Sequence, residues 1–319
     1  MSNIAETTMQ SPSGFLAASD MQCPANLLAL ATSSQPKPFA FVRAIGAATL
    51  ETARDAGLAG LAVPLLVGEP DIIAKDAAAI GWDLDGVEII PSTGEQEAID
   101  AALVLVSQGR AAGLVKGQLH TDVFMGGIVK RAAGIRTDKR LVHVFAMLPP
   151  AGGRALMISD AAVNVAPDIT TRVEAALHMA DLGRRLGQQR PKIAVLSATE
   201  TVLAAMPSSD DAARIAAAAM AADDAADYVG PLSFDLAIAP KAAAIKGVSN
   251  PVAGMADGLV VPTIEAGNIL FKALVWCGGG LAAGLVLGGT VPIVLTSRSD
   301  PPAARLASLA LAAIAGRPA

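Results

Sequence analysis

Short apolar runs alternate with alanine-rich stretches along most of the chain, starting near Pro38. The apolar runs are bounded by polar or glycine-containing segments, which is typical of buried strands. In the first half, strands are predicted at residues 39–42, 62–67, 87–90 and 114–115, and helices at 47–56, 70–80 and 94–109. Strands that alternate with helices predict right-handed crossovers and a largely parallel sheet.

A Pro149-Pro150 pair and a Gly152-Gly153 turn interrupt this alternation, which then resumes. Strands are predicted there at residues 155–159, 193–196, 236–238 and 258–261, and helices at 169–187, 210–223, 241–246 and 267–275. The double proline therefore predicts a boundary between two units. The expected fold class is α/β, with two domains of mostly parallel sheet and flanking helices.

One uncharged segment, residues 273–296, is long enough to span a bilayer of ~30 Å. Glycines at 278–280 and 288–289 interrupt it, and Pro292 precedes a β-branched run. No second apolar segment accompanies it, and no Lys/Arg cluster would orient it. We therefore expect a helix end followed by strands at 281–287 and 291–296, and no membrane partner.

Composition narrows the class of protein further. A chain of 319 residues with 53% hydrophobic residues is long enough for about two domains and too apolar for a disordered protein. Its net charge of -5 argues against a nucleic-acid partner, which requires an excess of Lys and Arg. Cys23 and Cys277 are too few for a disulfide framework. The polar stretch 1–22 has no signal-peptide pattern, so we expect a flexible leader on a cytoplasmic protein.

Polar residues gather after four of the predicted strands, where ligand sites of parallel sheets lie. They are Lys116, Gly117, His120 and Thr121; Asp160 and Asn164; Asn268 and Lys272; and Ser297, Arg298 and Asp300. Singly, Asn268 and Asp300 fit helix N-caps, and Asp160 and Asn164 fit loop caps. Together, the cationic side chains and helix-start N–H groups favour an anion site.

Several other site types do not fit the sequence. It has no phosphate-binding loop of the nucleoside triphosphatases, and the glycines at 278–280 lack the strand–helix context of a dinucleotide site. His120, His143 and His178 are spaced unlike any zinc motif, and His143 is predicted to lie in a strand. No metal site is therefore expected.

Four segments carry a family resemblance: LVKGQLHTD (114–122), MISDAAVNVAPD (157–168), KGVSNPVAGMADGLVVPTIEAGNILFKAL (246–274) and PIVLTSRSD (292–300). They resemble the phosphate acetyltransferase/phosphate butyryltransferase family, and its butyryltransferase-type branch in particular. The resemblance implies the reaction acyl-CoA + phosphate ⇌ CoA + acyl phosphate, with coenzyme A as substrate and no bound cofactor. It also implies the fold of isocitrate and isopropylmalate dehydrogenases, and a homodimer joined through the second domain.

In that fold the first domain includes the C-terminal segment. The resemblance thus implies a first domain of residues 23–148 plus 291–319 and a second of residues 149–290, with the active-site cleft between them. Residues 212–226 are rich in alanine and would pack closely, either between subunits or within the chain.

The resemblance also implies roles for individual residues. Ser297 and Arg298 match a Ser-Arg pair that stabilises the transition state and holds the phosphate. An aspartate proposed as base for the CoA thiol falls here near Ala304 and is missing, so Asp300 is the expected substitute. A family arginine is also missing, near Gly126-Gly127, and Arg131 or Arg136 is the expected replacement. The polar residues after the other three strands are expected to bind substrate.

Two other functions stay open at this stage. A NAD- and metal-dependent dehydrogenase on the related fold would use Asp160, Asp257 and Glu265 as metal ligands. A non-catalytic domain that senses CoA or acyl phosphate would keep the fold without turnover. The preferred acyl chain, from acetyl to butyryl, depends on pocket volume, where one methylene changes binding by only ~1–3 kcal/mol.

Overall fold

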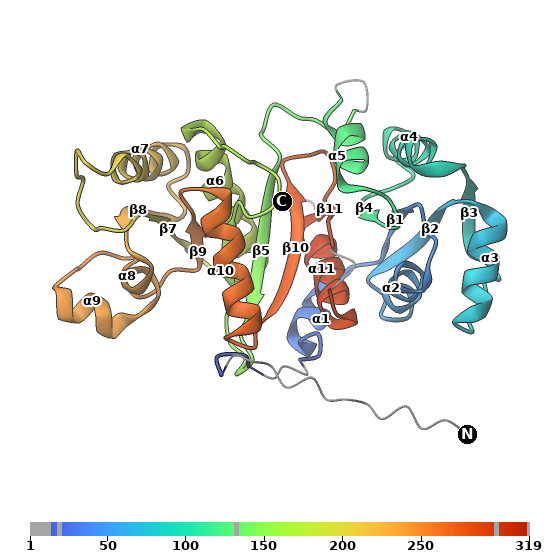
Figure 1. Ribbon diagram of the computed structural model, residues 1–319, viewed down its shortest axis with the longest axis horizontal. Helices are drawn as coiled ribbons and strands as arrows, with labels where there is room; N and C mark the ends of the chain where they lie inside the picture. Colours follow the sequence, from blue (N-terminus) through green and yellow to red (C-terminus); the bar gives the residue numbers. More distant parts are fainter. Residues whose placement is uncertain (1–13, 18–20, 131–133, 297–299, 318–319) are drawn as a thin grey trace.

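A single mixed sheet organises the chain (Figure 1). The computed structural model describes residues 14–17, 21–130, 134–296 and 300–317. Within these residues the sheet has eleven strands in the order β3-β2-β1-β4-β11-β10-β5-β6-β9-β7-β8. The strands β10 and β11, from the last part of the chain, lie at the centre of the sheet between β4 and β5.

The first half of the sheet is parallel, as the alternation predicted. Its strands are β1 (Lys37–Val42), β2 (Ala62–Gly68), β3 (Glu88–Pro91), β4 (Leu114–Lys116) and β11 (Ile293–Val294). The helices of this half are α1 (Ala25–Ala31), α2 (Ala47–Leu58), α3 (Pro70–Ala79), α4 (Gly94–Ser107), α5 (Thr121–Val129) and α11 (Pro302–Ala315). In Figure 1, α4 and α5 lie above this half, and α2 and α11 lie below it.

The second half is also parallel within itself. Its strands are β6 (Leu156–Ser159), β7 (Lys192–Leu196), β8 (Asp227–Leu232) and β9 (Gly258–Val260). Its helices are α6 (Ile169–Arg185), α7 (Pro207–Ala222), α8 (Phe234–Ile238), α9 (Pro240–Lys246) and α10 (Ile264–Trp276). The predicted α/β class, with a mostly parallel sheet and flanking helices, is therefore confirmed.

Two long strands join the halves and reverse their direction. β5 (Val142–Leu148) and β10 (Leu281–Leu287) pair antiparallel with each other, β10 pairs antiparallel with β11, and β5 does so with β6. The strands of the second half consequently run opposite to those of the first. Strand direction alone thus does not bring the polar residues after β4 and those after β6 to one edge of the sheet.

Small side chains allow the helices to approach the sheet closely. One continuous core cluster contains residues of α2, α11, α6 and α7, and so extends across both halves. Alanines of α7, among them Ala212, Ala216 and Ala219, are buried in it. The alanine-rich stretch therefore packs within the chain. The opposite face has two separate clusters, one beside α4 and α5 and the other beside α8 and α10.

The region 227–238 differs from the prediction. Residues 236–238, expected as a strand, belong to helix α8, and the strand β8 precedes them. A short apolar run does not distinguish a buried helix from a strand. Pro231 also obscures the strand pattern, but proline is tolerated on edge strands, and β8 is the last strand of the sheet.

The uncharged segment 273–296 contains the end of α10 and the strands β10 and β11, as predicted. Only Ile293–Val294 of the expected strand 291–296 pairs as a strand. No helix within the described ranges is long and apolar enough to cross a membrane. The division into two domains at 148/149 and 290/291 stays a prediction, as does the leader, whose residues 1–13 and 18–20 lie outside the described part of the chain.

Candidate functional site

An open pocket lies at the carboxyl ends of β1 and β4, against the first turns of α2. It is lined by Phe41, Ala48, Thr49, Thr52, Val115, Lys116, Gly117, Gln118, Thr296 and Arg305. These residues come from distant parts of the chain because β4 lies between β1 and β11 in the sheet. Two cations, three threonines and the first turns of α2 therefore line one pocket, a combination that suits an anion.

The two cations of the pocket are both buried. Lys116 ends β4 with 9% of its surface exposed, and Arg305 of α11 has 8% exposed. Arg305 donates from Nε to Thr52 Oγ1 at 2.8 Å and from Nη1 to the Asp300 carbonyl at 2.8 Å. Its Nη2 lies 3.7 Å from Glu51 Oε2. These contacts hold the guanidinium in place at the wall of the pocket.

Gly117 allows the chain after β4 to pass close to β1. A Cβ at this position would lie 2.5 Å from the Val42 carbonyl oxygen and 2.6 Å from that of Arg43. The Gly117 and Gln118 N–H groups donate to these same two carbonyls, each at 3.0 Å. The segment 116–118 is thereby fixed against the end of β1.

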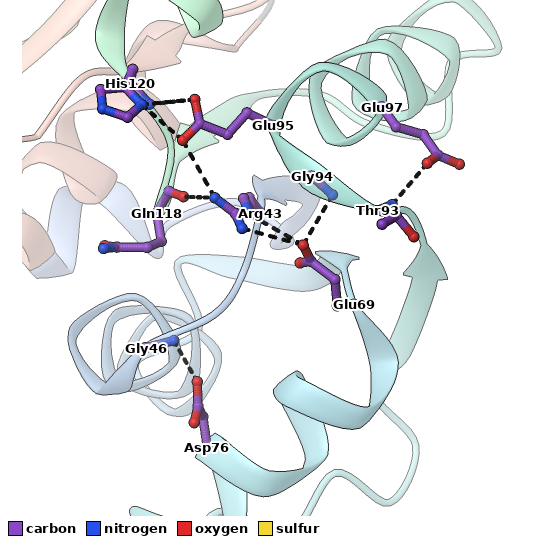
Figure 2. A network of polar contacts seen from close by, with 10 residues as sticks. All are labelled: Arg43, Gly46, Glu69, Asp76, Thr93, Gly94, Glu95, Glu97, Gln118 and His120. Carbon is purple, nitrogen blue, oxygen red and sulfur yellow. Dashed lines mark hydrogen bonds and ion pairs between the residues drawn. The ribbon is translucent and has the colours of Figure 1, made fainter.

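A network of charges surrounds this segment (Figure 2). Arg43 Nη1 lies 3.3 Å from Glu95 Oε1 and donates to the Gln118 carbonyl at 3.2 Å, while Nη2 lies 3.3 Å from Glu69 Oε1. Burial opposes ionisation of Glu69, but the Gly94 N–H and the Arg43 guanidinium hold its pKa below the ordinary value. Arg43 itself has φ +52°, an uncommon conformation for a residue with a side chain.

His120 is bound to this network through Glu95. Its Nδ1 lies 2.9 Å from Glu95 Oε1 and 3.0 Å from Oε2, and its backbone N–H donates to Oε2 at 3.1 Å. Hydrogen bonds from the His120 backbone and ring, together with the charge of Arg43, hold the pKa of Glu95 below its usual value. The imidazole is thus oriented by a carboxylate while 72% of the side chain stays exposed.

The predicted residues of the second half form a separate group. Asp160 is 5% exposed, and its carboxylate accepts from the backbone N–H groups of His143, Ala162 and Val163, each at 2.9 Å. Asn164 Nδ2 donates to Asp160 Oδ2 at 2.7 Å. Asn268 Nδ2 donates to the Ala161 carbonyl at 3.3 Å. The carboxylate of Asp160 therefore closes the loop after β6.

Helix α5 lies between the two groups. His120 is its N-cap residue and Thr121 its first residue, and Ile128 near its end is buried in the cluster against which Val163 packs.

Two predicted site residues lie on α10. Asn268 lies inside this helix, whose N-cap is Thr263, so its expected role as a cap is wrong. Lys272 is on the exposed side of α10, with its Nζ 6.0 Å from the Phe271 ring.

The expected catalytic pair lies outside the described residues. Ser297 and Arg298 directly follow Thr296, which lines the pocket, and Arg131 also falls outside the described part of the chain. Asp300 precedes the N-cap Pro301 of α11, and its carbonyl accepts from Arg305. Arg136 is exposed, and its backbone forms a bridge with Gly289.

Comparison with known proteins places the chain in a family. Residues 95–313 match the family model described as "Phosphate acetyl/butaryl transferase". The chain belongs to this family of acyltransferases. It is 41% identical to a phosphate acetyltransferase of Rhizobium meliloti over 90% of this chain and 92% of that protein. It is 33% identical to a phosphate butyryltransferase of Clostridium acetobutylicum, over 88% and 94% of the two chains.

Solved structures agree in fold. A branched-chain phosphotransacylase from Enterococcus faecalis superposes with a TM-score of 0.76 at 30% identity, covering 88% of this chain and 99% of that one. A 4-hydroxythreonine-4-phosphate dehydrogenase from Klebsiella pneumoniae reaches 0.56 at 15% identity, covering 89% and 100%. That second likeness shows a fold shared with a dehydrogenase, and no more than the fold.

The family match begins at Glu95 and includes the pocket residues from Val115 to Arg305, but not Arg43 or Glu69. No sequence pattern points to Arg43, Glu95 or Arg305 as site residues. Glu95 is in the first turn of α4, and Arg305 lies within α11. Their contacts join residues 52 and 253 positions apart, a separation that no local pattern reveals.

The candidate metal ligands do not form a cluster. Across the described ranges, no three His, Cys, Asp or Glu residues are placed to hold a metal ion. Asp257 Oδ1 lies 2.9 Å from Arg154 Nη1 and its Oδ2 accepts from the Lys192 backbone, while Asp160 is engaged with its loop. The family match, not this arrangement, separates the chain from the dehydrogenase alternative.

Proposed function

We propose that this protein catalyses the reversible transfer of a short acyl group between coenzyme A and phosphate: acyl-CoA + phosphate ⇌ CoA + acyl phosphate. The observation that carries the proposal is the family match over residues 95–313, which includes most of the basic pocket. Coenzyme A is a substrate here, and the transfer is direct, with no cofactor. Acyl chains from acetyl to butyryl fall within the activities named for the relatives.

The pocket beside Lys116 and Gly117 supports a site for the phosphoryl group. Buried cations stabilise anionic oxygens more strongly than exposed ones would. Arg298 is proposed to bind the phosphate or acyl phosphate, because a guanidinium can hold two oxygens at once. Thr121, at the start of α5, is proposed to assist in binding this part of the substrate.

Ser297 is proposed to donate to the carbonyl oxygen that becomes an oxyanion during transfer. Such a donor contributes about 2.7–4 kcal/mol to transition-state stabilisation. The CoA thiol also has to lose its proton, and Asp300 and His120 are the two candidates to accept it. We assign the group of Asp160, Asn164 and Asn268 to the coenzyme A side of the cleft. This assignment follows the proposed domain boundaries, since the group lies in residues 149–290.

A homodimer through α10 is part of the same proposal. Its side chains Ile269, Lys272, Ala273 and Trp276 are exposed and follow the i, i+3, i+4, i+7 spacing of one helix face. Ile269 is 68% and Trp276 61% exposed. Aromatic and aliphatic residues in one patch favour a protein–protein interface. α10 lies in the second half of the chain, through which we expect the subunits to join.

A cytoplasmic location is also proposed. Cys23 and Cys277 are both free thiols, as a reducing compartment maintains them. Their separation along the chain fits no disulfide framework.

The direct test measures release of free CoA from acetyl-, propionyl- and butyryl-CoA in phosphate buffer. Arg298→Ala is expected to lower kcat/KM by at least about 10²-fold, because the phosphate loses its bidentate partner. Arg214→Ala is the matched control, since Arg214 is 62% exposed on α7 beside Asp210. Near wild-type turnover by Arg298→Ala contradicts the role of this residue.

Two further outcomes would contradict the proposed activity. Tight CoA binding without turnover of any acyl chain indicates the sensing domain. A thermal shift with NAD and Mg²⁺ or Mn²⁺, but not with CoA, indicates the dehydrogenase.

A further inference from the structure

His120 and Glu95 are arranged as a base and the group that orients it (Figure 2). Both oxygens of Glu95 lie within 3.0 Å of Nδ1, at 2.9 and 3.0 Å. A neutral imidazole that donates from Nδ1 carries its lone pair on Nε2. Because the ring is exposed, Nε2 is presented outward in a defined tautomer, which is the geometry that general-base histidines share.

The charge network around Arg43 supports this orientation of the His120 ring. Arg43 bridges Glu95 and Glu69, and it also binds the Gln118 carbonyl. Its positive φ is an unfavourable conformation for a residue with a side chain, and the surrounding contacts offset this cost. Glu69 in turn accepts from the Gly94 N–H at the start of α4. The imidazole is thus supported by β1, β2 and α4 and does not depend on its own loop alone.

The same loop also forms a wall of the basic pocket. Lys116, Gly117 and Gln118 line the pocket, and His120 follows two residues later. Thr296 lines the opposite side of β4, because β11 pairs with it there, and the Ser297-Arg298 pair comes next in the sequence. The segment 116–120 therefore links the anion pocket to the oriented imidazole. It follows β4, the strand that pairs with β11, after which the predicted Ser-Arg pair comes in the sequence.

The proposed acyl transfer requires a base that accepts the proton of the CoA thiol. A thiol with an ordinary pKa near 8.5 is mostly protonated at neutral pH, and a positioned base contributes about 10²–10⁴-fold. The family resemblance implies an aspartate near Ala304, a residue of α11 that is 4% exposed and packs in the core. A base has to come from another element.

We propose that His120 is the general base for the CoA thiol and that Glu95 positions it; this inference rests on the proposed acyl transfer. In the synthesis of acyl-CoA, Nε2 accepts the thiol proton as sulfur attacks the acyl carbonyl carbon. The carbon–oxygen bond to phosphate breaks, and phosphate leaves with that electron pair. In the reverse direction a phosphate oxygen attacks the thioester carbon, the carbon–sulfur bond breaks, and protonated His120 returns the proton to the leaving sulfur.

His120→Asn tests the base directly. The Asn side-chain amide can still donate to Glu95 but has no Nε2, so the loop contact is kept. We expect kcat/KM for CoA to fall 10²–10⁴-fold. We also expect the decrease of kcat/KM at low pH, the acid limb of the pH profile, to disappear. In His120→Ala, added imidazole is expected to restore part of the activity.

Glu95→Gln tests the positioning residue. We expect kcat to fall at least tenfold while KM for CoA changes less than threefold, because the variant disturbs orientation and not binding. Glu97→Gln is the matched control: Glu97 is on the same turn of α4 and accepts from the Thr93 N–H at 2.9 Å, away from His120. The control is expected to keep wild-type activity.

The outcomes separate this inference from the proposed function. An active wild-type enzyme whose His120→Asn variant stays within threefold overturns the role of His120. So does a loss that imidazole does not rescue and that leaves the acid limb in place. A comparable loss in Asp300→Asn, with His120→Asn active, assigns the proton transfer to Asp300. An inactive wild-type protein overturns the proposed function itself, and this inference with it.

Discussion

Two carboxylates of this protein have different roles: one stabilises a loop, and the other orients a histidine side chain. Asp160 and Glu95 are both carboxylates after or beside strand ends. Asp160 is buried and accepts hydrogen bonds from its own loop and from β5, so its oxygens serve the backbone. Glu95 is partly exposed and binds an imidazole ring. Sequence reasoning selected Asp160 and passed over Glu95, because the partners of a carboxylate are set by tertiary contacts.

Gly117 supports a prediction at this scale. Gly117→Ala is expected to lower the free energy of unfolding by about 1–3 kcal/mol, because the new Cβ would overlap the carbonyls that end β1. It should also lower acyl-transfer activity, since the segment lines the pocket. Urea denaturation and CoA release measure the two effects.

Gly126→Ala is the matched control for this substitution. Gly126 lies in α5, and a Cβ there meets nothing within 4 Å. Alanine should stabilise the helix by about 0.5–1 kcal/mol. Equal stabilities of the two alanine variants would contradict the close approach at Gly117.

At the scale of elements, periodicity located most helices and strands but not their partners. The helix expected at residues 267–275 is α10, which begins earlier, at Ile264. The structure buries Gly267 and leaves a stripe from Ile269 to Trp276 exposed. The reason is that the sheet covers only one side of this helix. The other side of α10 is the face through which we propose that two copies of the chain associate.

Ile269→Lys tests the proposed dimer. A charge placed in the exposed stripe of α10 is expected to shift the mass measured by light scattering from dimer to monomer, because an unpaired charge is costly to bury. Ile245→Lys is the control, since Ile245 is 77% exposed on α9, a different helix. A monomeric wild type, or a dimer unaffected by Ile269→Lys, would contradict an interface at α10.

At the scale of the whole molecule, a buried and a largely buried histidine connect stability to pH. His143 in β5 is fully buried, and neither ring nitrogen has a hydrogen-bond partner among the described residues. Burial lowers its pKa to about 4, although the nearby Asp160 carboxylate opposes this shift. Burial and the charge of Lys139 lower the pKa of His178 to about 4 as well. Both rings are neutral in the folded protein at neutral pH.

Stability is consequently expected to fall as the pH decreases from about 6.5 to 4. In this range the unfolded chain binds protons at these two positions and the folded chain does not, so stability rises with pH. The loss is on the order of 3 kcal/mol for each histidine. Urea denaturation at pH 7.5 and pH 5 measures the part of this loss that is reached by pH 5, about 2 kcal/mol for each histidine. His143→Leu should reduce the pH dependence, and an unchanged dependence would contradict the assignment.

The sequence by itself determined the α/β class, the strand–helix alternation and the family, because period and motif are local properties of the chain. It also pointed to Lys116 and Gly117, which line the pocket, since strand ends can be read from the pattern. The tertiary structure decided the opposed directions of the two halves and the gathering of Arg43, Glu95 and His120. It also decided the contact of Arg305 with Thr52, 253 positions away. These depend on which strands become neighbours, and the order of strands in a sheet follows from packing the whole chain.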